Sequence, residues 1–160
     1  MAAAIMTGAP LFDSTECGLS DITICVTDGE EAKTYHAHKA ILANRSQWFY
    51  KRISGDAGLS TVKLKESNLL HFDLLMKYFY HHPGRHRANI NLDWLVETIS
   101  VYCMAEKYES ESVKEETIAR FASATSKFLF ADTKDKAKIV EAYYSRHSGS
   151  DAGMGRAIAG

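Results

Sequence analysis

Alternating apolar and polar residues near the start of the chain predict a β-hairpin. Every second residue from Ile22 to Val26 is apolar, which is the period-two pattern of a strand with one buried face. Asp28-Gly29 follows, and this dipeptide strongly favours a tight turn. A second short run ends near Tyr35, and a helical pattern begins there without a linker. The sequence therefore predicts a hairpin that leads directly into a helix.

Further along the chain, the pattern predicts one more strand and then only helices. Ser46 is placed to cap a short helix that contains Phe49, and alternation over residues 61–65 predicts the strand. Ser112, with Glu115 three residues later, predicts a capping box at the start of another helix. Apolar residues at helical spacing predict four further helices, whose apolar stripes lie within residues 69–79, 92–108, 113–129 and 139–144. The side chains expected to be buried on these apolar stripes are Phe49, Leu75, Phe79, Leu95, Ile99 and Phe121.

The composition is that of one globular domain without a nucleic-acid or membrane function. The 160 residues are 46% hydrophobic and 24% charged, with a formal net charge of -1. No stripe of Lys and Arg alternates with aromatic residues, which argues against nucleic-acid binding. No run of about 18 apolar residues occurs, and residues 1–10 lack the pattern of a secretory signal. The cysteines Cys17, Cys25 and Cys103 are odd in number and widely spaced, so we expect an intracellular location, in the cytoplasm or the nucleus.

The histidines are the only candidates for a metal site. His36 and His38 lie two residues apart on a predicted strand, so their side chains could share one face, with His81, His82 or His86 as further ligands. Two histidines do not hold zinc alone, and no Cys or carboxylate stands at ligand spacing. His38 is more simply a packing and hydrogen-bonding residue where the strand joins the helix. We expect neither a metal nor another cofactor, and a metal-dependent hydrolase is the alternative from another class of function.

No other residues of the chain suggest catalysis. A Gly-rich phosphate loop after a strand is absent, and no Ser, His and Asp set lies in a supporting motif. Cys103 lies among apolar residues, so we expect a core thiol rather than a nucleophile. Residues 63–66 are most simply interpreted as a solvated strand and loop. The sequence therefore predicts a protein that is not an enzyme.

Ten residues near the start of the chain have the identities and the spacing of a known family. They are Ser20, Asp21, Ile22, Ile24, Tyr35, His38, Lys39, Leu42, Ser46 and Phe49. Their order resembles the opening of the BTB (POZ) domain. Three later segments are similar to helices of the same family: Tyr78-Phe79-Tyr80, Ala105-Glu106-Lys107-Tyr108 and Val113-Lys114. The resemblance covers residues 20–121, and the rest of the chain looks like the tails of small stand-alone BTB proteins of fungal type.

The resemblance implies an α+β fold in which a small mixed sheet is layered against a cluster of helices, with extra helices at the C-terminus. On this basis, residues 18–124 form the BTB-like domain and residues 125–147 form a helical extension. Residues 1–17 are expected to be a flexible segment, and residues 148–160 a partly ordered tail.

For function, the resemblance implies non-catalytic protein–protein interaction, by self-association or by docking of a partner. In this family an acidic residue at the start of the first strand and a basic residue after the histidine lie close together, in a groove that takes part in assembly or partner binding. Asp21 and Lys39 match these positions, and the candidate groove includes the neighbouring His38 and Ser46. The alternative is that Asp21 only caps the segment before the strand and Lys39 is solvated.

Two differences from the family bear on the partner. The short segment before Asp21, which includes Pro10, does not predict the long helix that forms the family's swapped homodimer, so we expect a monomer or a weak homodimer. Adaptors that bind a cullin scaffold often carry an apolar-x-Glu element after the short helix, and residues 54–60 contain no Glu. A substrate adaptor of a cullin-type ubiquitin ligase is nevertheless the first alternative, because the resemblance does not identify the protein partner.

Overall fold

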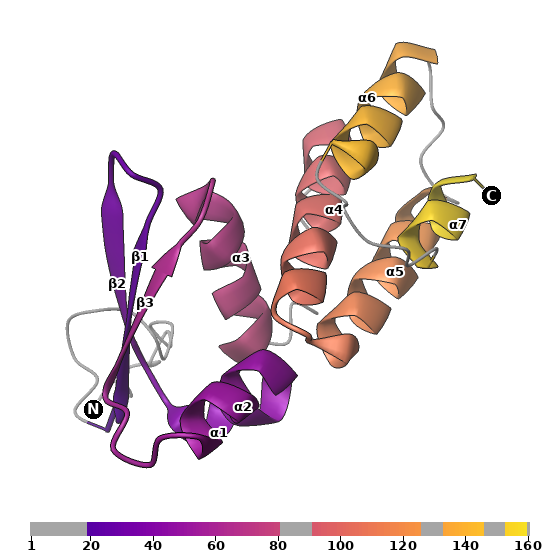
Figure 1. Ribbon diagram of the computed structural model, residues 1–160. Helices are drawn as coiled ribbons and strands as arrows, with labels where there is room; N and C mark the ends of the chain where they lie inside the picture. The colour runs from indigo at the N-terminus through magenta and orange to yellow at the C-terminus, as the bar shows by residue number, and fades with distance from the viewer. Residues whose placement is uncertain (1–18, 81–90, 126–132, 146–152, 160) are drawn as a thin grey trace, which may run out of the picture.

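The computed structural model describes residues 19–80, 91–125, 133–145 and 153–159 (Figure 1). Its strands are β1 (Ile22–Thr27), β2 (Ala32–Ala37) and β3 (Thr61–Lys65). Its helices are α1 (Lys39–Arg45), α2 (Gln47–Ser54), α3 (Leu69–Tyr80), α4 (Leu92–Lys107), α5 (Glu111–Thr125), α6 (Thr133–Tyr144) and α7 (Gly153–Ala159). The order of these elements agrees with the α+β class that the sequence predicts.

The three strands form one mixed sheet in the order β2-β1-β3. β1 pairs antiparallel with β2 and parallel with β3, so that Ile24 lies opposite both Tyr35 and Val62. Asp28 begins the turn between β1 and β2, and Gly29 follows with a φ of 106°, a conformation that glycine adopts without steric cost. The predicted hairpin and the predicted third strand are therefore confirmed.

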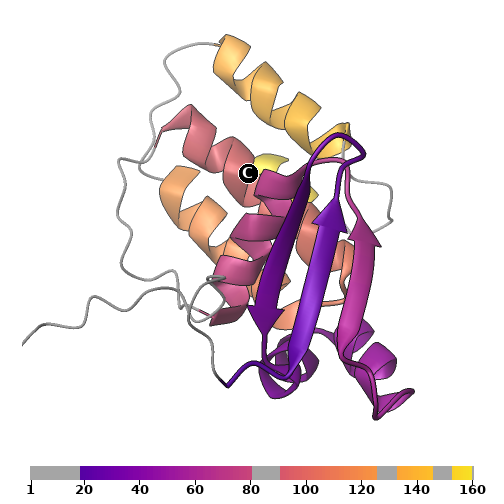
Figure 2. The same cartoon turned by 90° about the vertical axis from the view of Figure 1, so that its left-hand side faces the viewer.

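Helices pack against one face of the sheet, and Figure 2 shows them behind the three strands. β1 turns Ile22, Ile24 and Val26 toward the helices, and all three side chains are buried. The residues between them belong to the opposite face, which we call the outer sheet face. Its members include Thr23, Cys25, Thr34, His36, Lys63 and Lys65, and none of these six side chains is fully buried.

Two clusters of buried side chains form the core, and α4 contributes to both. The first cluster joins the sheet to α1, α2 and α3, and the second lies among α4, α5, α6 and α7. α4 turns Val101 toward the first cluster and Leu95 toward the second. The six side chains predicted to be buried are all at most 2% exposed: Phe49, Leu75, Phe79, Leu95, Ile99 and Phe121. The prediction of the core is confirmed.

The predicted capping box of α5 is wrong. The helix begins at Glu111, so Ser112 is its second residue and cannot be its cap. Ser110 precedes the helix instead, and its carbonyl oxygen accepts a hydrogen bond from the N–H of Lys114. The hydroxyl of Ser110 donates to the carbonyl of Arg45 at the end of α1. A contact between distant segments therefore decides where α5 starts.

The C-terminal helices α6 and α7 pack onto the second cluster. In α6, Ile139 and Tyr143 are buried, whereas Val140 and Tyr144 are exposed. Within the segment expected to be a tail, residues 153–159 form α7, and its Met154 is fully buried. The apolar stripe of α6 is therefore narrower than the sequence suggests, and α7 covers part of it.

Candidate docking site

Asp21 and Lys39 come together in the structure, but through the backbone rather than as an ion pair. Asp21 precedes β1, and its own N–H donates to the carbonyl of Ala37 at the end of β2. Its Oδ1 accepts a 2.7 Å hydrogen bond from the backbone N–H of Lys39, the first residue of α1. The first N–H groups of a helix have no partner within the helix, and a carboxylate near them also interacts favourably with the helix dipole. Asp21 therefore caps α1 from a different part of the chain.

The ammonium group of Lys39 lies against the loop that follows α2. Its Nζ is 3.4 Å from the carbonyl oxygen of Ala57, and no ion pair involves Lys39 within the ranges that the structure describes. Residues 55–58 of this loop are all exposed. We call the surface formed by Asp21, Lys39 and residues 55–58 the docking surface. Its charged groups are two carboxylates, those of Asp21 and Asp56, and the ammonium group of Lys39. Each carboxylate accepts a hydrogen bond from a backbone N–H, that of Lys39 for Asp21 and that of Gly58 for Asp56.

His38 has the structural role that the sequence analysis favours. Its backbone N–H donates to the hydroxyl of Tyr80 in α3 at 2.7 Å, and its ring Nδ1 lies 3.1 Å from the same hydroxyl. Its carbonyl oxygen accepts hydrogen bonds from Ile41 and Leu42 in the first turn of α1. His38 thus fixes the junction between β2 and α1, and it positions the neighbouring Lys39.

Ser46, by contrast, is buried away from the docking surface. Its Oγ accepts a hydrogen bond from the N–H of Phe49 at 3.1 Å, so it caps α2 as predicted. The same hydroxyl donates to the carbonyl of Tyr108 at the end of α4. Both hydrogen-bonding roles of the hydroxyl are therefore used inside the fold. Ser46 contributes to the site only by holding α2, and hence the loop after it, in place.

A buried carboxylate that the sequence analysis missed joins β3 to α4. Glu66, predicted to lie in a solvated loop, is only 4% exposed, so that expectation is wrong. Its carboxylate accepts hydrogen bonds from the Tyr108 hydroxyl and from Nζ of Lys107, the latter at 2.7 Å. Burial raises the pKa of Tyr108 well above its usual value, and the adjacent Glu66 carboxylate raises it further. The tyrosine of the Ala-x-Lys-Tyr segment was the only sequence signal for this contact.

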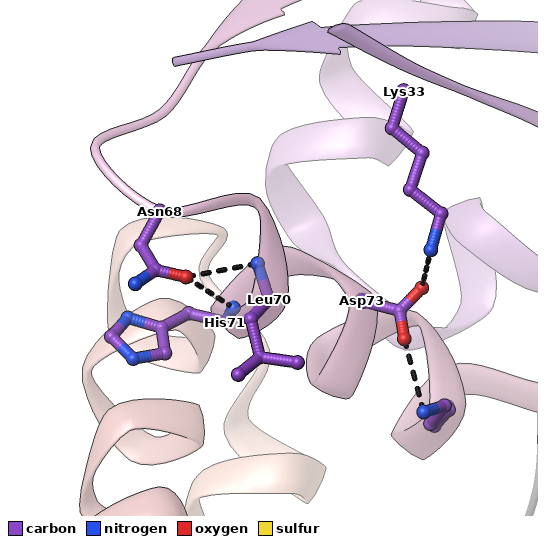
Figure 3. Close-up of polar contacts among 6 residues, drawn as sticks. Lys33, Asn68, Leu70, His71 and Asp73 are labelled. Carbon is purple, nitrogen blue, oxygen red and sulfur yellow. Dashed lines mark hydrogen bonds and ion pairs between the residues drawn. The ribbon is translucent and has the colours of Figure 1, made fainter. Parts of the chain in front are cut away.

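A second buried carboxylate joins the sheet to α3. Asp73 forms ion pairs with Lys33 of β2 and with Lys77 one turn later in α3, the latter at 3.0 Å. Figure 3 shows the side chain of Lys33 extending from the sheet toward the carboxylate of Asp73. Burial alone would raise the pKa of Asp73, but the two lysines outweigh burial and hold the pKa below its usual value. The spacing of Asp73 and Lys77 was visible in the sequence, whereas the contact with Lys33 required the fold.

The described residues offer little for chemistry. No group of three His, Cys, Asp or Glu side chains among them could hold a metal ion. His36 belongs to the outer sheet face, whereas the ring of His38 contacts α3, so the two rings do not share a face. His81, His82 and His86 lie outside the described residues. Cys103, expected in the core, is half-buried, and within the described ranges no helix is long and apolar enough to cross a bilayer.

Comparison with known protein families supports one assignment. The profile of the BTB/POZ domain matches residues 11–119, which is more than half of the chain. This range contains all three strands and helices α1 to α4, together with the docking surface. A search of curated proteins finds no match. BTB/POZ domains are protein–protein interaction modules, and the observed sheet and helix order is consistent with their fold. The chain belongs to the BTB/POZ domain family.

Proposed function

We propose that this BTB domain is a non-catalytic docking module that binds a protein partner through the docking surface. The observation that carries the proposal is the position of Lys39. Its backbone is fixed by Asp21 and His38, whereas its ammonium group, among the residues that the structure describes, contacts the carbonyl of Ala57 in an exposed loop and no carboxylate. A charge on a rigid backbone with little intramolecular pairing is well suited to recognising a partner. The partner is another protein or a second copy of the chain.

The contacts of the site favour a partner that places a carboxylate beside Lys39. Asp21 already accepts a hydrogen bond from a helix N-terminus, so its charge is partly compensated inside the fold. Asp56 likewise accepts a hydrogen bond from the N–H of Gly58, so Lys39 is the group of this surface whose charge a partner must pair. An unpaired charge buried in an interface is costly, so a partner that supplies a carboxylate is selected over one that does not.

Affinity purification from the native cell, followed by mass spectrometry, tests this proposal with a matched pair of variants. Lys39→Glu reverses the charge on the docking surface, and Lys63→Glu makes the same change on the outer sheet face. We expect the wild-type chain and Lys63→Glu to recover the same partner, and Lys39→Glu to lose it. Equal recovery by both variants would exclude the docking surface, whereas loss by both would implicate the charge of the whole molecule.

The same experiment also tests two more specific predictions from the sequence, the adaptor role and self-association. A cullin among the recovered proteins would support the role of ubiquitin-ligase adaptor, and a second copy of the chain would support self-association. Light scattering over a dilution series tests the latter, since we predict a monomer or a weak dimer that Lys39→Glu loosens further. The similarity to small BTB proteins of fungal type and the intracellular location stay predictions.

A further inference from the structure

Ser54 has a sequence context that no other hydroxyl residue of the chain shares. It is the only serine or threonine with basic residues at both the second and the third position before it, namely Arg52 and Lys51. Many protein kinases select their substrates by charge, using acidic pockets that bind basic residues beside the acceptor. The sequence around Ser54 therefore has the charge pattern of a substrate for a basic-directed serine/threonine kinase.

The position of Ser54 in the fold makes this segment accessible. Ser54 is the last residue of α2, and Lys51, Arg52 and Ser54 are all exposed. The next four residues, 55–58, form an exposed loop. α2 has only eight residues, and helix ends fray readily, so its last turn can open at low cost. Of the segment from 51 to 55, only Ile53 is partly buried against the core.

We infer that Ser54 is a phosphorylation site for a serine/threonine kinase that selects basic residues before the acceptor. In this step the Ser54 Oγ attacks the γ-phosphorus of ATP, and the bond from that phosphorus to the bridging β-γ oxygen breaks. ADP leaves, and the hydroxyl proton passes to the base of the kinase. Lys51 and Arg52 supply the two positive charges that such a kinase binds.

The phosphate would rearrange the polar contacts at the end of α2. The Ser54 hydroxyl now donates to the carbonyl of Tyr50 at 2.7 Å, and this donor is lost on phosphorylation. The negative phosphate also lies at the C-terminal end of a helix, where the dipole repels it. Lys51, which pairs with Glu109 at 2.6 Å, is near enough in sequence to be drawn to the phosphate instead.

These changes would reach the docking surface through the loop that follows Ser54. Lys39 contacts the carbonyl of Ala57, only three residues beyond the modified serine. A phosphate there would compete for the ammonium group that we assign to partner binding. This consequence rests on the proposed function, whereas the modification of Ser54 does not.

The test is phosphorylation of the purified full chain by a basic-directed serine/threonine kinase, with magnesium and ATP, followed by mapping of the phosphate by mass spectrometry. We expect a single phosphate on Ser54, and none on the Ser54→Ala variant. Arg52→Gln should lower the kcat/KM of the kinase for this chain by about tenfold or more, because the substitution removes a charged hydrogen-bonding group that the kinase binds. Ser60→Ala removes an exposed serine that has no basic residues before it, and it should be phosphorylated like the wild type.

Three results would overturn the site. A phosphate on another residue, or an Arg52→Gln variant that is modified at the wild-type rate, would show that charge does not select Ser54. Failure of the kinase to modify the folded chain would also overturn the site. Phosphorylation of a peptide of residues 48–60 would then show whether the fold or the sequence prevents the reaction. Because none of these readouts needs a partner, the failure of this site and the failure of the docking surface are distinguishable.

Discussion

At the scale of single residues, two buried carboxylates hold together elements that are far apart in the chain. Glu66 binds Tyr108 and Lys107, so the end of β3 is attached to the end of α4. Asp73 binds Lys33, so β2 is attached to α3. A buried charge is tolerated only where hydrogen bonds and opposite charges compensate for lost hydration. Removing a hydrogen-bonding partner of either carboxylate should therefore lower the unfolding free energy more than removing the same atoms from an exposed side chain.

The tyrosine that binds Glu66 allows the cleanest test of this reasoning. Tyr108→Phe leaves the ring in place but deprives a buried carboxylate of one hydrogen bond, which should cost about 1–3 kcal/mol of unfolding free energy. Urea denaturation measures the effect. Tyr144→Phe removes the same hydroxyl from a side chain that is 71% exposed, and it should change stability little. Equal effects of the two substitutions would show that Glu66 does not depend on Tyr108.

Asp73 should make stability depend on pH at the acid end. Its folded pKa lies below the usual value of 3.8, so the unfolded chain takes up its proton first as the pH falls. The stabilising contribution is therefore present above pH 3.8 and is lost as the pH drops through the lowered folded pKa. Asp73→Asn should be less stable than wild type at neutral pH, with a difference that shrinks in this acid range. Urea denaturation across that range measures this difference, and Glu115→Gln, which changes an exposed carboxylate, is the control. A difference in unfolding free energy between wild type and Asp73→Asn that stays constant with pH would contradict the prediction.

At the scale of elements, local signals were readable from the sequence and distant contacts were not. Asp28-Gly29 predicts the hairpin turn and Ser46 predicts the cap of α2, because both act on residues within a few positions. The start of α5 was placed wrongly, since Ser110 is held there by a carbonyl 65 residues away. Glu66 was misplaced for the same reason, because its partner Tyr108 is 42 residues distant. At the candidate site, the proximity of Asp21 and Lys39 followed from the family resemblance, whereas their backbone contact did not.

The connection between α4 and α5 contains a residue in an uncommon conformation. Glu109 has a φ of 49°, and β-branched residues adopt this region only with strain. Glu109→Val should therefore lower the unfolding free energy by about 1–2 kcal/mol. Lys51→Met removes only the exposed ion pair with Glu109, and it should cost no more than about 1 kcal/mol. Thermal unfolding of both variants separates backbone strain from the loss of the ion pair. Equal losses of unfolding free energy would show that the charge of Glu109, rather than its backbone conformation, matters for stability.

At the scale of the whole molecule, α4 makes the two core clusters parts of one structure. Each cluster has one partly buried tryptophan, Trp48 beside the first and Trp94 beside the second. The variants Trp48→Phe and Trp94→Phe therefore each leave a fluorescent probe of a single cluster. Because both clusters bury faces of the same helix, we expect coincident urea transitions from the two probes. Separate midpoints, after correction for the stability of each variant, would show that the C-terminal helices unfold independently.

In the proposed function, the surface around Lys39 binds the partner of this BTB domain. Hydrogen–deuterium exchange of the chain, with and without the protein recovered by affinity purification, tests it most directly. We predict slower exchange in peptides that cover residues 38–42 and 55–58, and unchanged exchange in peptides from β3, which carries Lys63. Protection confined to β3 or to the C-terminal helices α6 and α7, with residues 38–42 unaffected, would contradict the account.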